Sequence, residues 1–496
     1  MPDARDHKGI ALFLLCLVQF MVVLDIAIVN VALPSIKNAL DFGETSLSWV
    51  INAYTLTFGG LLLLGGRAAD LLGRRRIFIT GLLLFAAASA ACGFANSETT
   101  LIAARAIQGI GAALVSPAAL SILVTTFEEG PERNRALGIW GAIAGSGGAA
   151  GVLLGGILTQ ELSWSWIFFI NVPVGIAVAL AAPRYLLESR VEGGTRSFDV
   201  LGAVLATGGM SVLVYGLVQT VDHSWSAPRT IGLFVAAAVM LAGFIATERR
   251  VNAPLMPLGI FRNRSLSAAN GVALMLGASI FSMFFLLTLY MQQILGYSPL
   301  RTGVGYLLVS SVIIVSAATS QAIVTRIGVR TVLATGMLLT ALGLVYFSRI
   351  SVGGSYLVDL TPGFILTGVG LGFSFVPVSI AALVGVKQNE AGIASGILNT
   401  SQQIGGALGT AILSTVAFTE AADYAKSHLS LAANSAGGRL LLEAHSSVHG
   451  YSTAFLVGAL ISAIGFVLTL LFIPRGDAPE YALTEGAEVA TETAAA

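Results

Sequence analysis

Long apolar segments separated by short polar stretches run along almost the whole chain. Each is apolar enough to predict a helix that crosses a lipid bilayer, a crossing that takes about 20 residues. The fourteen segments span residues 9–34, 49–66, 77–94, 101–127, 137–158, 166–182, 200–218, 230–247, 266–295, 304–325, 332–347, 360–386, 391–419 and 451–474. The pattern predicts an all-α membrane protein with fourteen transmembrane helices.

The composition agrees with this pattern. Hydrophobic residues make up 55% of the chain and charged residues 10%, and the mean hydropathy is +0.85, which excludes an ordinary soluble domain. The first segment follows a charged start but is too long for a secretory signal and lacks a clean cleavage site, so we expect it to remain as an anchor. Cys16 and Cys92 lie inside apolar segments and indicate buried positions, with no disulfide framework.

Positive charge is distributed unevenly between the two sides of the predicted membrane protein. Of the 26 Lys and Arg residues, 19 fall in the tails and loops on the side of the N-terminus, 6 on the other side, and Arg105 within a segment. Basic residues favour the cytoplasmic side of a membrane. The sequence therefore predicts a multi-pass protein with both termini in the cytoplasm.

An internal repeat relates the loop after the second segment to the loop after the tenth. Gly73, Arg75, Thr80 and Gly81 match Gly328, Arg330, Thr335 and Gly336 at one common offset. Two related six-helix halves are the plan of many secondary transporters, whose substrate site lies between the halves near the bilayer midplane. We expect a six-helix bundle over 1–187, an inserted helix pair with linkers over 188–265, a second six-helix bundle over 266–475 and a disordered cytoplasmic tail over 476–496.

Two charged residues, Asp25 and Arg105, lie within the fourteen segments. A charge at the bilayer centre costs about 2.5–3.5 kcal/mol on insertion scales, and such residues commonly serve transport. Their depths are compatible with one shared cavity. Burial favours the neutral form of a carboxyl and a guanidinium favours the charged form, so a moving cavity wall could switch Asp25 between proton uptake and release. The alternative is a static structural ion pair.

Several motifs resemble those of the major facilitator superfamily, and within it the fourteen-helix drug:proton antiporters, a branch of multidrug and antibiotic efflux permeases. The similar stretches are the loop from Gly66 to Arg76, the run from Leu24 to Pro34, Arg105 with Gln108, Gly109 and Gly111, and Trp164, Trp166, Phe168, Asn171, Pro173 and Gly175. Together they extend over nearly the whole chain. The resemblance implies a major facilitator fold in a bacterial cytoplasmic (inner) membrane.

The resemblance also assigns roles to individual residues. It implies that Arg105 takes part in proton transfer. It further implies that the loop after the second helix acts as a cytoplasmic latch during alternating access, through Gly66, Asp70, Gly73, Arg74, Arg75 and Arg76. Two positions depart from the family pattern, since Leu71 stands where a basic residue is common and Ala27 replaces a threonine.

The fifth segment departs from the family's antiporter motif at one position. Gly147, Gly151, Gly155 and Gly156 fit the motif, whereas Val152 occupies the position of its proline. The motif therefore gives weaker support to export as the direction of transport. The first three glycines recur every four residues and form one smooth helix face that another helix can approach closely. Val152 leaves the helical hydrogen bonds complete, so no kink is required. Generic helix packing is the alternative to a role in export.

Polar side chains within the segments are candidates for the substrate cavity. They are Asn30, Asn52, Tyr54, Gln108, Asn270, Tyr290, Gln293, Asn399, Gln402 and Gln403. Most small-molecule pockets are apolar with a few such polar groups. Hydrogen bonding between helices is the alternative for each of them.

Other functional classes lack the residues they need. No Gly-Lys-Ser or Gly-Lys-Thr forms a phosphate-binding loop, and all five histidines fall in tails or loops, so we expect no catalytic residue and no enzyme. Glu443, His445 and His449 have a spacing that could suit a metal, but solvated polar groups are the more common case in such a stretch, which is predicted to be the longest external loop, 420–450. We expect no metal, no cofactor other than the coupling proton, no nucleic acid and a monomer.

The sequence thus predicts proton-coupled efflux of small hydrophobic or cationic drugs across the cytoplasmic membrane by alternating access. The partners of the predicted transporter would be these substrates, protons and the lipid bilayer. A dedicated metabolite or lipid exporter or symporter of the same fold is the first alternative. A membrane receptor or scaffold without flux is the second.

Overall fold

A computed structural model describes residues 4–43, 45–128, 131–190, 199–221, 223–251, 254–386, 390–429 and 436–475. Over these ranges the chain is helical, and 14 helices are long and apolar enough to cross a membrane. This confirms the predicted fold class. The tail expected over 476–496 and residues 191–198 of the predicted linker lie outside the described residues.

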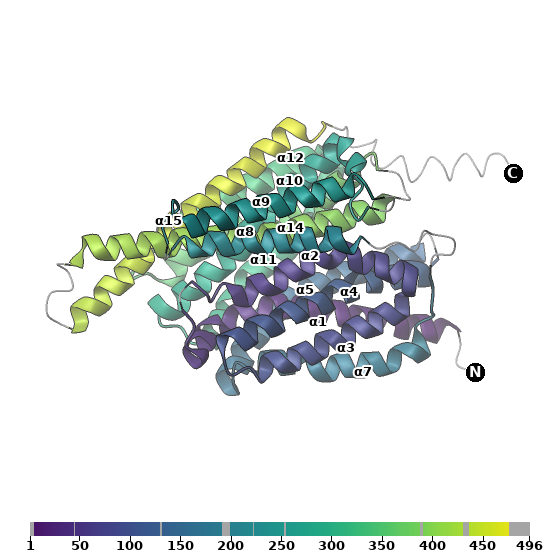
Figure 1. Cartoon of the computed structure of the whole chain (residues 1–496), viewed down its shortest axis with the longest axis horizontal. Coiled ribbons are helices and arrows are strands. Elements are labelled where there is room, and N and C mark those ends of the chain that lie inside the picture. Colours follow the sequence, from purple (N-terminus) through teal and green to yellow (C-terminus); the bar gives the residue numbers. More distant parts are fainter. Residues whose placement is uncertain are drawn as a thin grey trace.

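The helices fall into two groups joined by a pair. The first group is α1 (Ala4–Leu40), α2 (Trp49–Leu72), α3 (Arg74–Gly93), α4 (Glu98–Thr126), α5 (Pro131–Glu161), α6 (Trp166–Phe169) and α7 (Asn171–Tyr185), and the pair is α8 (Val200–Gln219) and α9 (Pro228–Glu248). The second group is η1 (Leu258–Arg262), α10 (Arg264–Leu289), η2 (Tyr290–Ile294), α11 (Pro299–Ile327), α12 (Val329–Phe347), η3 (Tyr356–Leu360), α13 (Thr361–Leu383), α14 (Ala391–Ser427) and α15 (Ala436–Phe472). Figure 1 shows the helices of both groups running along one common direction.

The two ends of the molecule differ. The beginning of α1 and the end of α15 lie at the same end, here called the terminal face, and α14 and α15 project beyond the opposite end, here called the hairpin face (Figure 1). Between the groups, α2 packs against α14 and α5 against α11. Helix α8 packs against α9, and it also contacts α2 of the first group and α14 of the second.

The predicted external loop over 420–450 is wrong. Helix α14 continues to Ser427 and α15 already begins at Ala436, so the described part of this stretch is a helical hairpin. A search for apolar segments does not find this stretch because it contains many polar residues, although Ala and Leu, which favour helices, are frequent in it. A ring contact joins the two helices, because Tyr424 of α14 lies 4.8 Å from the ring of His449 of α15, and His428 at the end of α14 stacks on Tyr424 at 4.0 Å.

Helices α5 and α11 of the two halves touch near the hairpin face. Gly156 of α5 lies against Pro299 of α11, and the backbone of Val152 lies against Gly303. About one and three turns from Val152 toward the terminal face, on the same side of α5, a Cβ at Gly148 or at Gly141 would meet open space. Further hydrogen bonds between the halves run from Gln292 Nε2 to Val31 O (2.7 Å), from Thr400 Oγ1 to Gly59 O (3.0 Å) and from Leu300 N to Gln160 Oε1 (3.4 Å).

The predicted glycine face of α5 packs closely on α1. A Cβ at Gly151 would lie 2.7 Å from Ala27 Cβ and 2.9 Å from Leu24 O. Gly147 and Gly155 contact α1 in the same way, whereas Gly156 faces α11. Helix α5 is continuous through Val152, as expected without a proline.

Replacing Gly151 with valine should therefore destabilise the protein. Overpacking of a close contact costs about 1–3 kcal/mol, and the backbone of α1 leaves the new side chain no room. Thermal unfolding of the purified protein in detergent measures the effect. Gly148→Val is the matched control, because a Cβ at Gly148 meets open space. Equal unfolding temperatures for the two variants would contradict the close packing of α1 on α5.

Candidate functional site

The buried charges Asp25 and Arg105 form an ion pair. Asp25 on α1 and Arg105 on α4 are 0% and 1% exposed. Arg105 Nη1 lies 2.7 Å from Asp25 Oδ2. The sequence placed the two residues at depths compatible with one shared cavity, and the structure brings them into direct contact inside the first half of the molecule.

Two amide side chains complete the coordination of the carboxylate. Gln108 Nε2 of α4 donates to Asp25 Oδ1 at 2.8 Å, and Asn171 Nδ2 of α7 donates to the same oxygen at 2.9 Å. Both amides also donate to Ser89 Oγ at 3.2 Å, and this hydroxyl donates to Phe168 O at 2.8 Å. Because each of these partners of Asp25 is a donor, the arrangement suits a charged carboxylate.

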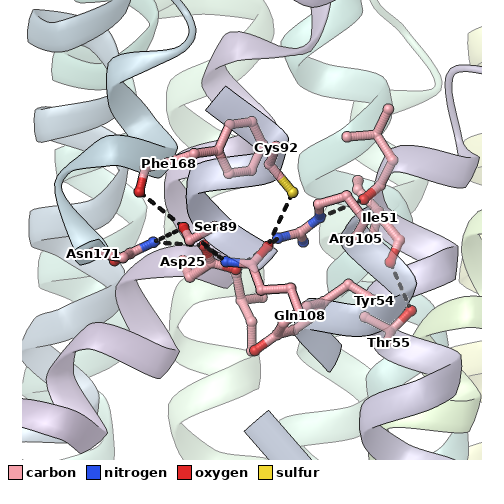
Figure 2. Close-up of polar contacts among 12 residues, drawn as sticks. Asp25, Ile51, Tyr54, Thr55, Ser89, Cys92, Arg105, Gln108, Phe168 and Asn171 are labelled. Carbon is pink, nitrogen blue, oxygen red and sulfur yellow. Dashed lines mark hydrogen bonds and ion pairs between the residues drawn. The ribbon is translucent and has the colours of Figure 1, made fainter. Parts of the chain in front are cut away.

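The guanidinium of Arg105 is held from several directions. Its Nε donates to Val50 O at 2.9 Å, and its Nη1 also donates to Gln108 Oε1 at 2.7 Å. The guanidinium carbon lies 4.3 Å from the ring centre of Tyr54 and 5.7 Å from that of Phe168, so cation–π attraction adds to the hydrogen bonds. Figure 2 shows the side chains of this network converging from α1, α2, α3, α4, α6 and α7.

Sequence reasoning missed part of this network. Gln108 was expected in the substrate cavity, but the structure places it against Asp25 and Arg105. Asn171 was noted as part of a motif, with no link to Asp25. Ser89 carried no signal at all, because a serine within a helix commonly bonds to its own backbone.

The loop between α2 and α3 is tied to the segment that follows α7. Gly73 joins the two helices with φ 111°, a conformation that side chains with a Cβ rarely adopt. Asp70 Oδ1 accepts from Arg74 Nη2 at 3.0 Å, and Arg74 N donates to Ser189 O at 3.0 Å.

The remaining arginines of this loop contact the same segment. Arg75 Nη1 donates to Leu186 O at 3.0 Å and to Pro183 O at 3.3 Å, and Glu188 lies 3.8 Å from Arg75 Nε and 3.9 Å from Arg76 Nε. Gly66 lies beside Pro117 of α4. These contacts stay within the first half, so a latch between the halves remains a prediction.

The other substrate-cavity candidates occupy different surroundings. Four candidates of the second half form hydrogen bonds with other residues of that half. Asn270 Oδ1 accepts from Ser401, and Tyr290 donates to Ser351 O. Gln293 accepts from Tyr451, and the exposed Asn399 donates to Ser395 O. Gln402 is half-buried. Tyr290 and Gln293 lie in or beside the π-helical turn η2 at the hairpin end of α10, so the structure does not gather all the candidates in one place.

Four candidates carry buried polar atoms without a hydrogen-bond partner among the described residues. These atoms are Asn30 Oδ1, both amide atoms of Asn52, the Tyr54 hydroxyl and Gln403 Nε2. They belong to α1, α2 and α14, the helices that meet between the halves. Buried polar groups almost always have a partner, which for these would be water or a bound molecule.

Comparison with known proteins decides the family. The model of the Major Facilitator Superfamily matches residues 15–410. The chain belongs to the major facilitator superfamily. This facilitator is 40% identical to the puromycin resistance protein pur8 of Streptomyces alboniger over 93% of this chain and 90% of that protein. It is 41% identical to the cephamycin export protein CmcT of Amycolatopsis lactamdurans over 82% and 84% of the two chains.

Solved transporter structures share the fold at low sequence identity. A bacterial homologue of the human lysosomal transporter Spinster, in an inward-facing and unoccupied conformation, superposes with a TM-score of 0.68 at 14% identity, over 94% of this chain and 98% of that one. A peptide transporter POT in complex with sulfate gives 0.64 at 17% identity, over 96% and 100%. The described part of the facilitator holds no group of three or more His, Cys, Asp or Glu side chains suited to a metal ion.

Replacing Arg105 with alanine should destabilise the facilitator strongly, by about 3–5 kcal/mol, because it leaves the buried charge of Asp25 unpaired. The double variant Asp25→Asn/Arg105→Ala removes both charges and should recover part of the loss. Thermal or denaturant unfolding of the purified proteins measures both effects. Arg301→Ala is the control, since that exposed arginine contacts the ring of Tyr297 and no buried acid. A double variant less stable than Arg105→Ala would contradict the argument.

Proposed function

We propose that this facilitator exports small hydrophobic or cationic drugs across a bacterial cytoplasmic membrane in exchange for protons. The observation that carries the proposal is the buried ion pair of Asp25 and Arg105. A carboxylate removed from water and held by movable partners can bind a proton in one state and release it in another. The facilitator then acts as a transporter and not as an enzyme, with the proton as coupling ion and no other cofactor.

The substrate class is supported by the relatives. Their names record resistance to puromycin and lincomycin and export of cephamycin and tetracenomycin C, and one is named a multidrug resistance protein. These compounds differ chemically, which favours an apolar path with a few adaptable polar groups over one tightly matched pocket. Asn30, Asn52, Tyr54 and Gln403 supply such groups, because each has at least one buried polar atom without a hydrogen-bond partner among the described residues.

We infer that the terminal face is cytoplasmic, because most Lys and Arg residues belong to that side. With this orientation, the contacts between α5 and α11 close the external side, and the open space beside Gly141 and Gly148 faces the cytoplasm. The structure then corresponds to the state that receives drug from inside. A charged Asp25 fits this state, since an antiporter releases its proton before it takes up its export substrate.

The return step requires a proton from outside. Protonation of Asp25 removes the charge that Arg105 neutralises, and the hydrogen bonds from Gln108 and Asn171 lose their charged acceptor. The network that joins α1 to α4 and α7 then loosens, which allows these helices to shift relative to one another. Each proton that moves inward gains about 2.3 kcal/mol per 100 mV, enough to drive uphill export of a neutral solute. A monomer suffices for this cycle.

Replacing Asp25 with asparagine should abolish uphill export. Asparagine has almost the same shape but does not titrate, so substrate can still cross down its own gradient while coupling is lost. The measurement is puromycin accumulation in inverted membrane vesicles under an imposed proton gradient, with and without a protonophore. Asp423→Asn, an exposed acid of the hairpin, serves as the matched control.

The outcomes of this experiment separate the competing functions. If Asp25→Asn still accumulates puromycin fully under a proton gradient, the ion pair of Asp25 and Arg105 in the wild type has only a structural role, and its role in proton coupling is overturned. A wild-type protein that moves puromycin in the same direction as protons would be a symporter. Absence of flux for puromycin, lincomycin and cephamycin alike would support a dedicated exporter or a receptor.

Replacing Asn171 with leucine should destabilise the facilitator. The change removes the donor that lies 2.9 Å from Asp25 Oδ1, and a hydrogen bond to a charged group contributes about 1.5–3 kcal/mol. Thermal or denaturant unfolding of the purified protein measures the loss. Thr55→Val serves as control, because the hydroxyl of Thr55 donates to backbone oxygens of its own helix. Equal stabilities of Asn171→Leu and the control would exclude Asn171 from holding Asp25 in place.

A further inference from the structure

The hairpin end of α10 is an irregular turn that reaches the other half of the molecule. After Leu289 the helix continues as the π-helical turn η2, in which Leu295 N donates to Tyr290 O at 3.0 Å, five residues back instead of four. A single π-helical turn inserts one extra residue into a helix and is frequent at functional sites. The extra residue rotates the side chains beside it by roughly 100° around the helix axis. The turn thus determines where its glutamines point.

The turn is fixed to its own half by the neighbours of Gln292. Tyr290 is fully buried, and its hydroxyl donates to Ser351 O at 2.8 Å. On the other side of Gln292, the side chain of Gln293 accepts from the hydroxyl of Tyr451 of α15 at 3.4 Å. These contacts hold η2 in the second half, so Gln292 is carried by a rigid support.

Gln292 itself crosses the boundary between the halves. Its Nε2 donates to Val31 O of α1 at 2.7 Å, and Val31 is fully buried. A carbonyl oxygen has two lone pairs, so Val31 O can accept from Gln292 and from its own helix at once. Pro34 follows three residues later, and because proline has no N–H, the carbonyl of Asn30 loses its usual helical donor. The hydrogen bonding of α1 is therefore interrupted next to the carbonyl that Gln292 reaches.

This hydrogen bond lies among apolar side chains of both halves. Val29 and Leu33 of α1 belong to the same cluster of buried residues as Leu289 and Met291 of the second half. A hydrogen bond is electrostatically stronger in such surroundings than in water, and its donor and acceptor must find new partners when they separate. Good geometry extends over only roughly half an ångström. The bond therefore favours one arrangement of α1 against α10 more sharply than apolar packing does.

We propose that Gln292 is a positioning residue that locks α1 to α10 at the hairpin face, and that it releases Val31 O when this face opens. The proposal rests on the alternating access of the proposed function, in which the hairpin face is external. In the state described here the lock keeps the path between the halves closed to the outside. When the halves part at this face, water replaces Gln292 at the carbonyl. One side-chain hydrogen bond thereby sets part of the balance between the two states.

Side-specific labelling of an introduced thiol tests the lock. Asn30→Cys places a thiol one residue from Val31, at a position that is 5% exposed. The native cysteines are buried, and the protein without Asn30→Cys gives their background. In sealed vesicles, a membrane-impermeant maleimide added on the side of the hairpin face reacts at a rate that follows the fraction open at this face. Gln292→Leu and Gln292→Met, which have no N–H donor in the side chain, should each raise this rate roughly two- to tenfold, the change that corresponds to loss of one hydrogen bond.

Labelling from the terminal face separates a lock from general loosening. From that side the rate should stay equal or fall in both variants, because one face closes as the other opens. Gln219→Leu is the matched control and should label like its parent, since Gln219 Nε2 donates to Tyr215 within α8. Parental rates from the hairpin face in both Gln292 variants, or a comparable rise from both faces, would overturn the proposal.

The labelling needs neither drug nor proton gradient, so its result is independent of the export assay. A facilitator that does not export puromycin but shows the expected rise would refute the proposed function and support the lock. A facilitator that exports puromycin but shows parental rates in both Gln292 variants would refute the lock alone.

Discussion

The desolvated carboxylate of Asp25 imposes the main constraint on the first half of this facilitator. An acid with no exposure to water must find its hydrogen bonds within the protein, and it finds them in Arg105, Gln108 and Asn171. Because these donors belong to α4 and α7, one side chain of α1 holds three helices together. Such a network is stable as a whole, and a change in the charge at its centre affects all of its members.

Close helix packing determines where the halves can move. The glycine face of α5 brings α1 and α5 into backbone contact, so these two helices form one stiff unit. The neighbouring face of α5 contacts α11 near the hairpin face and meets open space near the terminal face. A rocking motion about the contacts of Val152 and Gly156 would therefore open one side while it closes the other.

Much of the architecture could be predicted from the sequence, because the bilayer imposes a strong rule on hydropathy. All fourteen apolar helices were predicted, and the depths of Asp25 and Arg105 in their segments were compatible with the contact that the structure shows. The helical extensions of α14 and α15 were missed, since polar helices outside the bilayer obey no such rule. Ser89 was missed because its role depends on side chains brought together from distant parts of the chain.

The length of α14 has a mechanical consequence. At about 1.5 Å per residue its 37 residues extend over roughly 55 Å, whereas the hydrocarbon core is about 30 Å thick. Helix α14 contacts α2 between the halves, and its far part is braced by α15. Because α14 is long, a small tilt about its contact with α2 moves its far end by a larger distance. A pair of spectroscopic labels, one near Tyr424 and one on the first half, would thus read out the internal motion from the aqueous phase.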